Sequence, residues 1–337
     1  MTLRVGITGY GLAGRYFHAP LLKGVGFDVV AVLTNNEERI SHVASDFPEA
    51  KTFTDLAQFL DQRLDLVVVA SANVVHAEHA LAAIAAGIAV VVDKPMGRTL
   101  VETQLIIDAG SAAQVPVTTF FNRLWDSDAL TLKRVLSEGL LGEVFRIDSR
   151  FERFRPVRNI NSWRENMSPA DGGGILLDLA PHLLSTALDW FGPATLMHSM
   201  VRSIRGGADD DIVLTLHHAT GVDSYLAGSA IAASPGPRIR LLGANGALVI
   251  NDLDPQEALL RSGKFPKNGT WDVPTKTLAY IHRENSVEEI ESEPGNYAHF
   301  YKAVWAALKG DGQWPITTDQ ALAVARIIEQ ARSVSIR

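Results

Sequence analysis

The chain of 337 residues lacks cysteine, an excess of basic residues and long apolar runs. Without cysteine it has no disulfide, no thiolate zinc site and no cysteine nucleophile, which fits a reducing compartment. Its 31 Lys and Arg against 38 Asp and Glu give a net charge of −7, so no basic face for nucleic acid is expected. The apolar runs are too short to cross a bilayer, and a strand-like pattern within three residues of Met1 leaves no room for a signal peptide. We therefore expect a soluble, cytoplasmic protein.

The remaining composition is that of an ordinary globular protein, with 47% apolar and 20% charged residues. The length predicts two domains, each large enough to bury a core of its own. The pattern of elements changes near Trp125. We therefore expect a first domain of residues 1–122 and a second domain of residues 123–337.

A glycine-rich turn follows the first strand-like run and precedes a helical pattern over residues 15–23. In a dinucleotide site Gly9 permits the tight turn, Gly11 lets the backbone approach a pyrophosphate, and Gly14 allows close packing of helix on strand. The anion would lie at the helix N-terminus, against the backbone of Leu12 and Ala13. The turn predicts a nucleotide site, although a glycine turn can also serve packing alone.

Strand-like and helical patterns alternate through the first third of the chain. The strand-like runs cover residues 5–8, 29–33, 66–70, 89–92 and 115–121, and several are apolar on both faces, as in a covered parallel sheet. This alternation predicts a doubly wound Rossmann-type sheet, whose ligands bind at the carboxyl ends of the strands. The polar residues predicted at that edge are Thr34, Asn35, Ser71, Asn73, His76, Asp93, Lys94 and Asn122.

The choice of cofactor depends on the residues after the second strand. NAD-specific folds place a carboxylate about twenty residues past the glycine turn, where this chain has Thr34. Thr34 and Asn35 can donate hydrogen bonds to a 2′-phosphate, and Arg39 can supply charge. We therefore expect NADP(H). NAD remains an alternative if Glu37 or Glu38 turns inward, but these residues fit the acidic first turn of a helix.

The second part of the chain has strand-like runs at hairpin spacing, flanked by helical patterns. We expect a C-terminal α/β domain with an open, largely antiparallel sheet. One face of that sheet would be exposed in a monomer, so a homodimer or homotetramer is expected. The final helix, over residues 318–333, can pack back on the first domain.

Three residues are candidates for chemistry. Lys94 follows a strand at the cofactor edge, where a lysine can stabilise a developing oxygen charge. Asp178 and His182 are four apart at a helix start, after a glycine run that would leave this end approachable by a ligand, so a carboxylate can orient a histidine base. The alternatives are a surface lysine, an N-cap aspartate and an ordinary histidine. Trp163 and Arg164 can contact a ligand or pin their loop. No metal site is expected.

Three motifs in this order, Gly9–Gly14, Asp93-Lys94-Pro95 and Asp178-x-x-x-His182, resemble the Gfo/Idh/MocA oxidoreductase family. That family usually has Glu-Lys-Pro, so Asp93 is a conservative departure that leaves Lys94 in place. A closer resemblance, over nearly the whole chain, is to the branch of NADP-dependent scyllo-inositol dehydrogenases. It is carried by residues 17–21, 121–128, 150–156, 178–184 and 254–257.

The resemblance implies a Rossmann domain, a C-terminal α/β domain and metal-free hydride transfer between NADP(H) and a ring carbinol of a polyol or sugar. It implies that His182 is the acid/base, that Asp178 orients it and that Lys94 stabilises the substrate oxygen. Asn122, Trp163 and Arg164 would line the nicotinamide and sugar, and Lys94–Pro95 would be cis. A reductase of another carbonyl or an imine is the alternative enzyme, and a nucleotide-binding regulatory protein is the alternative without turnover.

Overall fold

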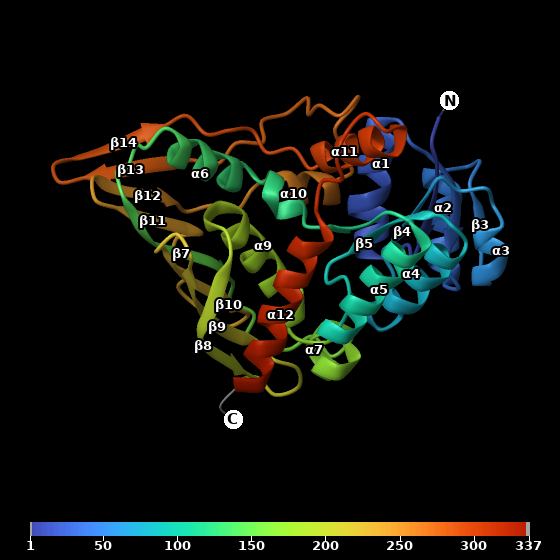
Figure 1. The fold of residues 1–337 in the computed structure, drawn as a ribbon, viewed down its shortest axis with the longest axis horizontal. Coiled ribbons are helices and arrows are strands. Elements are labelled where there is room, and N and C mark those ends of the chain that lie inside the picture. Colours follow the sequence, from blue (N-terminus) through green and yellow to red (C-terminus); the bar gives the residue numbers. More distant parts are fainter. Residues whose placement is uncertain (1, 335–337) are drawn as a thin grey trace. The chain divides into compact units, whose positions relative to one another are not determined.

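The computed structural model describes residues 2–334, which form two compact units. The first unit runs to Phe120 and also includes Gln256–Val273 and Asn296–Leu322. The second unit comprises Phe121–Pro255, Pro274–Gly295 and the described residues from Ala323 onwards. Figure 1 labels the elements of both.

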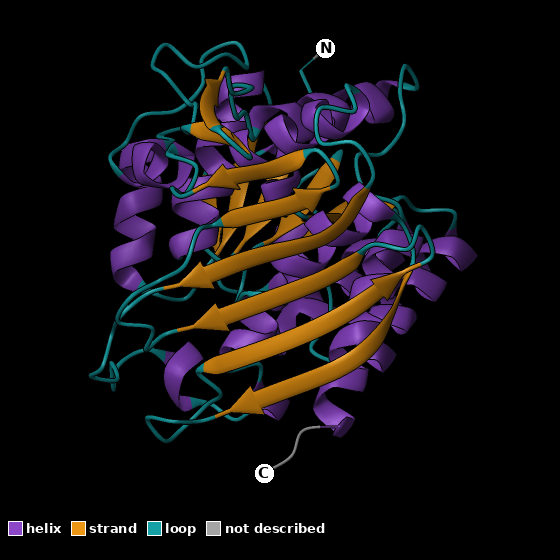
Figure 2. Ribbon diagram, turned by 90° about the vertical axis from the view of Figure 1, so that its left-hand side faces the viewer, coloured by secondary structure: helices purple, strands orange, loops and turns teal. Residues whose placement is uncertain are grey.

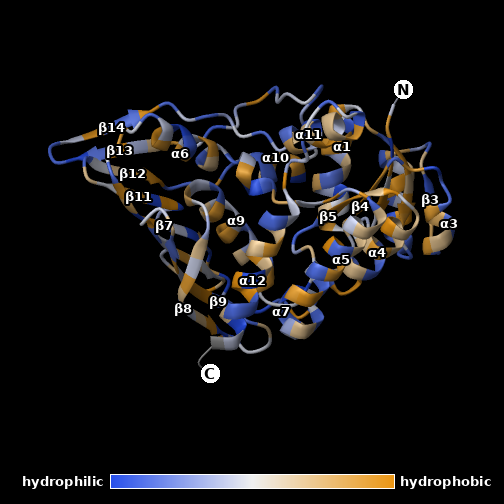
Figure 3. Cartoon of the chain, viewed as in Figure 1, coloured by the Kyte–Doolittle hydropathy of each residue, from blue (hydrophilic) through white to orange (hydrophobic). Residues whose placement is uncertain are grey.

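The first unit is built on a six-stranded sheet in the order β3-β2-β1-β4-β5-β6, in which every neighbouring pair is parallel. Its strands are β1 (Arg4–Thr8), β2 (Asp28–Leu33), β3 (Lys51–Phe53), β4 (Leu66–Val69), β5 (Ala89–Asp93) and β6 (Val117–Phe120). All four residues of β4 are buried, as expected for a strand covered on both faces. Figure 3 shows these strands as mostly hydrophobic. The predicted doubly wound sheet is confirmed.

Helices follow the strands of this unit in the predicted alternation. They are α1 (Ala19–Val25), α2 (Glu37–Asp46), α3 (Leu56–Leu60), α4 (His76–Ala85) and α5 (Leu100–Ala113), with a short helical turn, η2 (Asn73–Val75), before α4. Two later helices, α10 (Gln256–Arg261) and α11 (Ala298–Lys309), also belong to the first unit. The sequence analysis did not anticipate these additions, because a helical pattern does not say which sheet the helix covers.

The helix after the glycine turn contains a π-helical turn, η1 (Gly14–His18), directly before α1. Pro20 explains this widening: it has no N–H to donate, and its ring clashes with the carbonyl one turn back. The turn carries His18 into the interior, where the side chain is fully buried.

The second unit contains an eight-stranded sheet in the order β14-β13-β12-β11-β7-β10-β9-β8. The β7–β10 pair is parallel and the other neighbouring pairs are antiparallel. The strands are β7 (Val144–Glu152), β8 (Ala194–Arg202), β9 (Asp211–His218), β10 (Asp223–Ser229), β11 (Ile239–Gly243), β12 (Gly246–Ile250), β13 (Ala279–Arg283) and β14 (Ser286–Ile290). The predicted largely antiparallel sheet is confirmed, although the sequence analysis missed β13 and β14.

Helices of the second unit lie behind this sheet in Figure 2, while its other face is turned to the viewer. They are α6 (Ser127–Ser137), α7 (Trp163–Asn166), α8 (Ile175–Asp178), α9 (Ala180–Phe191) and most of α12 (Thr318–Val334), with short turns η3 (Asn122–Trp125) and η4 (Pro169–Asp171). The core between α6 and this sheet contains Leu132 of α6 together with Ile147, Leu241 and Leu248. Among residues 2–334, no helix is long and apolar enough to span a membrane.

Candidate functional site

Two of the three glycines in the glycine turn, Gly9 and Gly14, are closely packed against neighbouring backbone. Gly9 has a positive φ of 85°, and a Cβ atom there would lie 2.5 Å from the Cα of Ser71. A Cβ atom on Gly14 would lie 2.1 Å from the carbonyl oxygen of Gly9. These two positions admit no side chain, because the neighbouring backbone occupies the space.

Gly11 differs, because its missing side chain leaves room next to a cation. The three atoms nearest to a Cβ built on Gly11 all belong to the guanidinium of Arg39, at 3.5–3.8 Å. Arg39 lies in the first turn of α2 and is exposed, and its backbone N–H donates to the Asn36 side chain at 3.0 Å. A phosphate can approach this backbone, and an exposed arginine borders it. This arrangement fits a dinucleotide that carries a 2′-phosphate.

The residues after β2 follow the arrangement expected from the sequence. Thr34 is buried at the strand end, Asn35 is exposed, and Glu37 and Glu38 occupy the first turn of α2. Acidic residues there complement the positive end of the helix dipole.

A partly buried hydrogen-bonded group connects the glycine turn to Asp46 at the end of α2. Tyr10, between the first two glycines, donates its hydroxyl to Asp46 Oδ2 at 3.1 Å, and Arg15 Nε donates to the same oxygen at 2.9 Å. Burial, and next the charge of Asp46, raise the pKa of Tyr10 far above its usual value. The sequence analysis missed this group, since Asp46 is 31 residues beyond Arg15 and no local pattern connects them.

His76 connects the ends of β4 and β5. Its Nδ1 lies 2.9 Å from the carbonyl oxygen of Pro95, and its Nε2 lies 3.1 Å from that of Ser71. The side chain is buried, and burial lowers its pKa below the usual value. His76 thus lies between two strand ends, and its neutral form can donate to one of the two backbone carbonyls. Asn73, in η2 just before α4, is also buried.

Lys94 follows β5 directly and is partly exposed. Its backbone N–H donates to Oδ1 of Asp93 at 2.8 Å, and the Lys94–Pro95 bond is cis, as the resemblance implied. Burial opposes ionisation of Asp93, but contact with His18 and the nearby Lys94 and His76 together lower its pKa. Asp93 is therefore a carboxylate beside the candidate lysine.

In the second unit, the predicted single helix around Asp178 and His182 is two helices. Asp178 ends α8, and α9 starts at Ala180 with Pro181 in its first turn. The N-cap of α9 is Leu179, so the N-cap alternative for Asp178 is wrong. His182 lies in the first turn of α9 and is 8% exposed.

Arg164, in α7, contacts both Trp163 and Asp178. Its Nε lies 3.5 Å from Asp178 Oδ1, and its guanidinium lies 4.5 Å from the centre of the Trp163 ring. Its carbonyl oxygen accepts a hydrogen bond from the N–H of Gly174 at 2.8 Å. The structure thus groups three of the predicted residues: Trp163, Arg164 and Asp178.

The glycine run before α8 is filled by protein atoms rather than left open. A Cβ on Gly173 would lie 2.1 Å from the Met167 carbonyl oxygen, and one on Gly174 would lie 1.9 Å from Oδ1 of Asp209. Asp209 accepts the Leu176 N–H at 2.7 Å, and burial raises its pKa to about 6. The sequence suggested that these glycines leave the helix start approachable, whereas here they accommodate a carboxylate and a carbonyl.

A buried charged cluster lies beside His182. The ring of Phe151 lies edge-on to His182 at 6.1 Å between centroids. The Cζ atoms of Arg238 and Arg123 lie 4.0 Å and 5.4 Å from the centre of the Phe151 ring. Each guanidinium has a buried carboxylate partner, Asp128 at 3.0 Å for Arg238 and Asp126 at 3.3 Å for Arg123. Asn122, next to Arg123 in η3, is also buried.

For residues 121–128 and 150–156, the sequence analysis assigned a physical role only to Asn122, at the strand-end edge, and otherwise quoted a resemblance. The structure shows that they converge next to His182. No local spacing could have indicated this, because Arg238 comes from a distant strand end.

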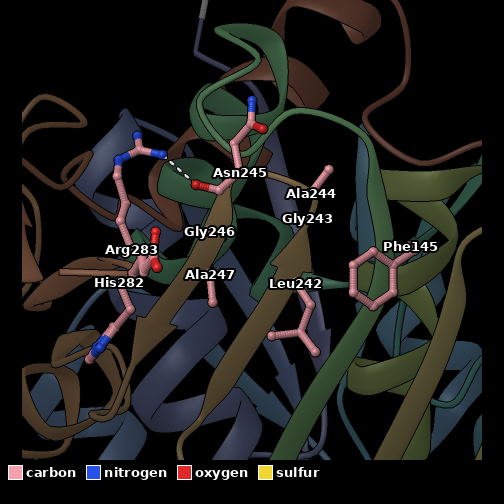
Figure 4. Close-up of a pocket in the computed structure, with 10 residues that line it drawn as sticks. Phe145, Leu242, Gly243, Ala244, Asn245, Gly246, Ala247, His282 and Arg283 are labelled. Carbon is pink, nitrogen blue, oxygen red and sulfur yellow. Dashed lines mark hydrogen bonds between the residues drawn. The ribbon is translucent and has the colours of Figure 1, made fainter. Parts of the chain in front are cut away.

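A pocket of about 580 Å³ lies on the second sheet, near the β11–β12 hairpin. Figure 4 shows Phe145, Leu242 and Ala247 along it, and the Arg283 Nη1 donating to the Asn245 carbonyl oxygen at 2.6 Å. None of the candidate residues lines this pocket. Within residues 2–334, no group of three or more His, Asp or Glu is arranged to hold a metal ion.

Two family models match the chain. Residues 3–121 match the NAD-binding Rossmann fold of the Gfo/Idh/MocA oxidoreductase family, and residues 133–334 match the C-terminal alpha/beta domain of that family. The solved structure of yvaA from Bacillus subtilis is similar with a TM-score of 0.88 and 30% identity, covering 99% of this chain and 98% of that one.

Two relatives are similar over nearly their full lengths. The oxidoreductase YdgJ of Escherichia coli, whose activity is uncharacterised, is 38% identical, covering 97% of this chain and 94% of its own. The scyllo-inositol 2-dehydrogenase (NADP(+)) IolW of Bacillus subtilis is 32% identical, covering 99% of this chain and 94% of its own. The chain belongs to the Gfo/Idh/MocA oxidoreductase family.

Proposed function

We propose that the protein is an NADP(H)-dependent dehydrogenase that transfers a hydride between the cofactor and a ring carbinol or ketone of a cyclic polyol or sugar similar to scyllo-inositol. The observation that carries the proposal is the Arg39 guanidinium against the open side of Gly11. The identity with a relative named as an NADP(+)-dependent scyllo-inositol dehydrogenase supports both cofactor and substrate class.

The first unit would hold the cofactor. Gly9, Gly11, Leu12, Ala13 and Gly14 would bind the pyrophosphate through backbone N–H groups at the helix start. Arg39, Thr34 and Asn35 would bind the 2′-phosphate through charge and hydrogen bonds. The strand-end residues Ser71, Asn73, His76 and Asp93 would border the remaining part of the cofactor. A cofactor held by these residues would supply the hydride chemistry at C4 of its nicotinamide.

The protein's own side chains would handle the proton and the oxygen. Oxidation removes a hydride from the carbinol carbon and a proton from its hydroxyl, so a base has to take that proton. We assign this role to His182, oriented by Asp178, whose carboxylate Arg164 contacts at 3.5 Å. Lys94 would stabilise the oxygen as charge develops on it. Asn122, Trp163 and Arg164 would line the nicotinamide and the substrate.

The test is to follow the absorbance of the reduced nicotinamide with NADP(+) or NAD(+) and a panel of inositols, aldoses and sugar acids. We expect turnover with a neutral polyol and a preference for NADP(+). Turnover only with another carbonyl or an imine would move the protein to the alternative class of reductase. Tight NADPH binding without turnover would indicate a nucleotide-sensing protein and contradict the proposal.

We also propose that the chain forms a homodimer or homotetramer through the outer face of the second sheet. Tyr225 and Arg240 both pair with Asp148 in register, so the three share the face opposite the buried Leu226 and Leu241. Tyr225 is 41% exposed there. Light scattering at micromolar concentration should show an oligomer, and a charge introduced on that face by Tyr225→Glu should dissociate it. A monomeric native chain would contradict this proposal.

A further inference from the structure

His18 is a fully buried polar residue for which the proposed reaction has no role. It lies in η1, on the helix that begins at the glycine turn. Its Nδ1 lies 2.6 Å from the hydroxyl oxygen of Tyr301, which comes from α11 and is itself fully buried. Phe120 packs on the imidazole, with ring centroids 4.5 Å apart.

The other ring nitrogen of His18 points to the strand end that carries Lys94. Nε2 is buried and makes no hydrogen bond within the described part of the chain, and Asp93 Oδ1 lies 3.8 Å away. The same oxygen accepts the backbone N–H of Lys94 at 2.8 Å. One carboxylate oxygen therefore faces both the imidazole and the backbone of the candidate lysine.

The protonation of this group follows from its partners. Burial, and next the charge of Asp93, raise the pKa of Tyr301 well above its usual value, so its hydroxyl stays protonated. A carboxylate opposite Nε2 favours the tautomer with its proton on that nitrogen. Nδ1 then accepts from the Tyr301 hydroxyl. The donor groups therefore point in one direction, from the Tyr301 hydroxyl to His18 and from His18 toward Asp93.

An apolar side chain would fill this position at lower cost than a buried imidazole with an unsatisfied nitrogen. The surroundings are aromatic: Phe120, Phe300 and Tyr301 pack against one another. Packing alone therefore does not account for a histidine here.

We propose that His18 and Tyr301 are positioning residues for Lys94, acting through the Asp93 carboxylate. The proposal rests on the proposed function, in which Lys94 stabilises the substrate oxygen. Nε2–H faces Asp93 Oδ1 at 3.8 Å and orients that carboxylate. The carboxylate then fixes the Lys94 backbone. The helix that begins at the glycine turn continues through η1 to His18, and His18 faces the Asp93 carboxylate beside Lys94. This helix therefore connects the proposed pyrophosphate site to the group that positions the lysine.

The test uses His18→Leu, which fills the space without polar atoms, and His18→Gln, which can still accept from Tyr301 and donate to Asp93. With the best polyol of the panel and NADP(+), we expect His18→Leu to lower kcat about 10- to 100-fold, the range for a misplaced reacting group. His18→Gln should recover to within about threefold of the native rate. The NADPH dissociation constant, measured by fluorescence, should stay within about threefold for both.

The matched control is His218→Leu in the second unit. His218 is also fully buried, with Nδ1 at 2.9 Å from the Gly192 carbonyl oxygen and Nε2 at 2.8 Å from the Ser224 hydroxyl. We expect His218→Leu to lower the melting temperature without a selective decrease in kcat. If His18→Leu does not fold, Tyr301→Phe carries the same test, since it removes only the hydroxyl.

A double-mutant cycle with Lys94→Ala separates the two proposals. If His18 acts through Lys94, then adding His18→Leu to Lys94→Ala lowers kcat no further. Independent, multiplicative losses would overturn the positioning role while leaving Lys94 as assigned. A Lys94→Ala variant with native kcat would overturn the proposed function of that lysine, and the positioning role with it. Equal kcat for His18→Leu and the native chain would overturn the positioning role alone.

Discussion

The two units place their polar groups in opposite ways. In the first unit the sheet is apolar throughout β4, and the strand ends combine backbone contacts, such as the carbonyls of Ser71 and Pro95 beside His76, with a partly exposed carboxylate, Asp93, near His18. In the second unit, whole ion pairs are buried next to His182, including Arg238 with Asp128. Backbone groups give a fixed shape, whereas buried charges set a local field. We infer that the proposed role of the first unit depends on the space around its backbone, and that of the second unit on its buried charges.

If the first unit depends on space, filling a packed glycine should have the largest effect. In Gly14→Ala the new Cβ would meet the Gly9 carbonyl oxygen at 2.1 Å, so the turn has to shift. We expect NADPH binding to weaken on the order of 1,000-fold, about 4 kcal/mol. Fluorescence titration measures it. Gly87→Ala is the control: its added Cβ would have no atom within 4 Å, although its φ of 73°, unlike the backbone of Gly14, is unfavourable for alanine. Equal losses in both variants would contradict this reading.

Lys94→Ala tests the division of labour within the first unit. The side chain is expected to act on the reacting oxygen, so kcat should fall by about 100-fold or more. The NADPH dissociation constant should stay within about threefold of the native value. Steady-state kinetics and fluorescence titration check the two numbers. A variant that loses only NADPH affinity would make Lys94 a cofactor ligand instead.

Asp209 tests the cost of buried charge in the second unit. Its folded pKa of about 6 lies above the ordinary 3.8, so the folded state favours the protonated form. The contribution of protonated Asp209 to the free energy of unfolding is therefore fully present below about pH 4. It is lost as the pH rises through about 6, and the loss is at most about 3 kcal/mol. Asp209→Asn keeps an acceptor for the Leu176 N–H and should flatten this dependence. Melting temperatures from pH 4 to 8 measure it, and parallel curves for both proteins would contradict the assignment.

Arg39→Ala should have the smallest effect of the series. Removing the guanidinium beside Gly11 takes away charge that would face the 2′-phosphate. The ratio of kcat/KM with NADP(+) to that with NAD(+) should fall about tenfold, or 1.4 kcal/mol. Lys51→Ala, an exposed cation elsewhere in the first unit, is the control. A native chain that prefers NAD(+) tenfold would show that Glu37 or Glu38 faces the ribose.

The parts of the first unit that are local in sequence could be predicted. The close packing of Gly9 and Gly14, the parallel sheet and the position of Glu37 and Glu38 in a helix start depend on residues within a few positions of one another. The support of the turn by Asp46 and the contact of His18 with Tyr301 could not, since the latter partners are 283 residues apart. Helical periodicity shows an apolar face but not the sheet that it covers.

The second unit was less predictable for the same reason. β14 escaped the sequence analysis because Glu288 and Glu289 are consecutive and exposed, so the strand lacks alternation. Asp178 and His182 became candidates through their spacing, yet the Arg238 and Phe151 contacts beside His182 depend on the pairing of β7 with β11. Buried charge of this kind has no local sequence signal.

The measurement that tests the account most directly is the His182→Ala variant, assayed for both kcat and NADPH binding. His182 belongs to the second unit and the glycine turn to the first. The account predicts a loss in kcat of about 100- to 10,000-fold, as for a positioned acid/base. It also predicts an NADPH dissociation constant within about threefold of the native one. Near-native kcat, or a loss of NADPH binding comparable to the loss in rate, would contradict it.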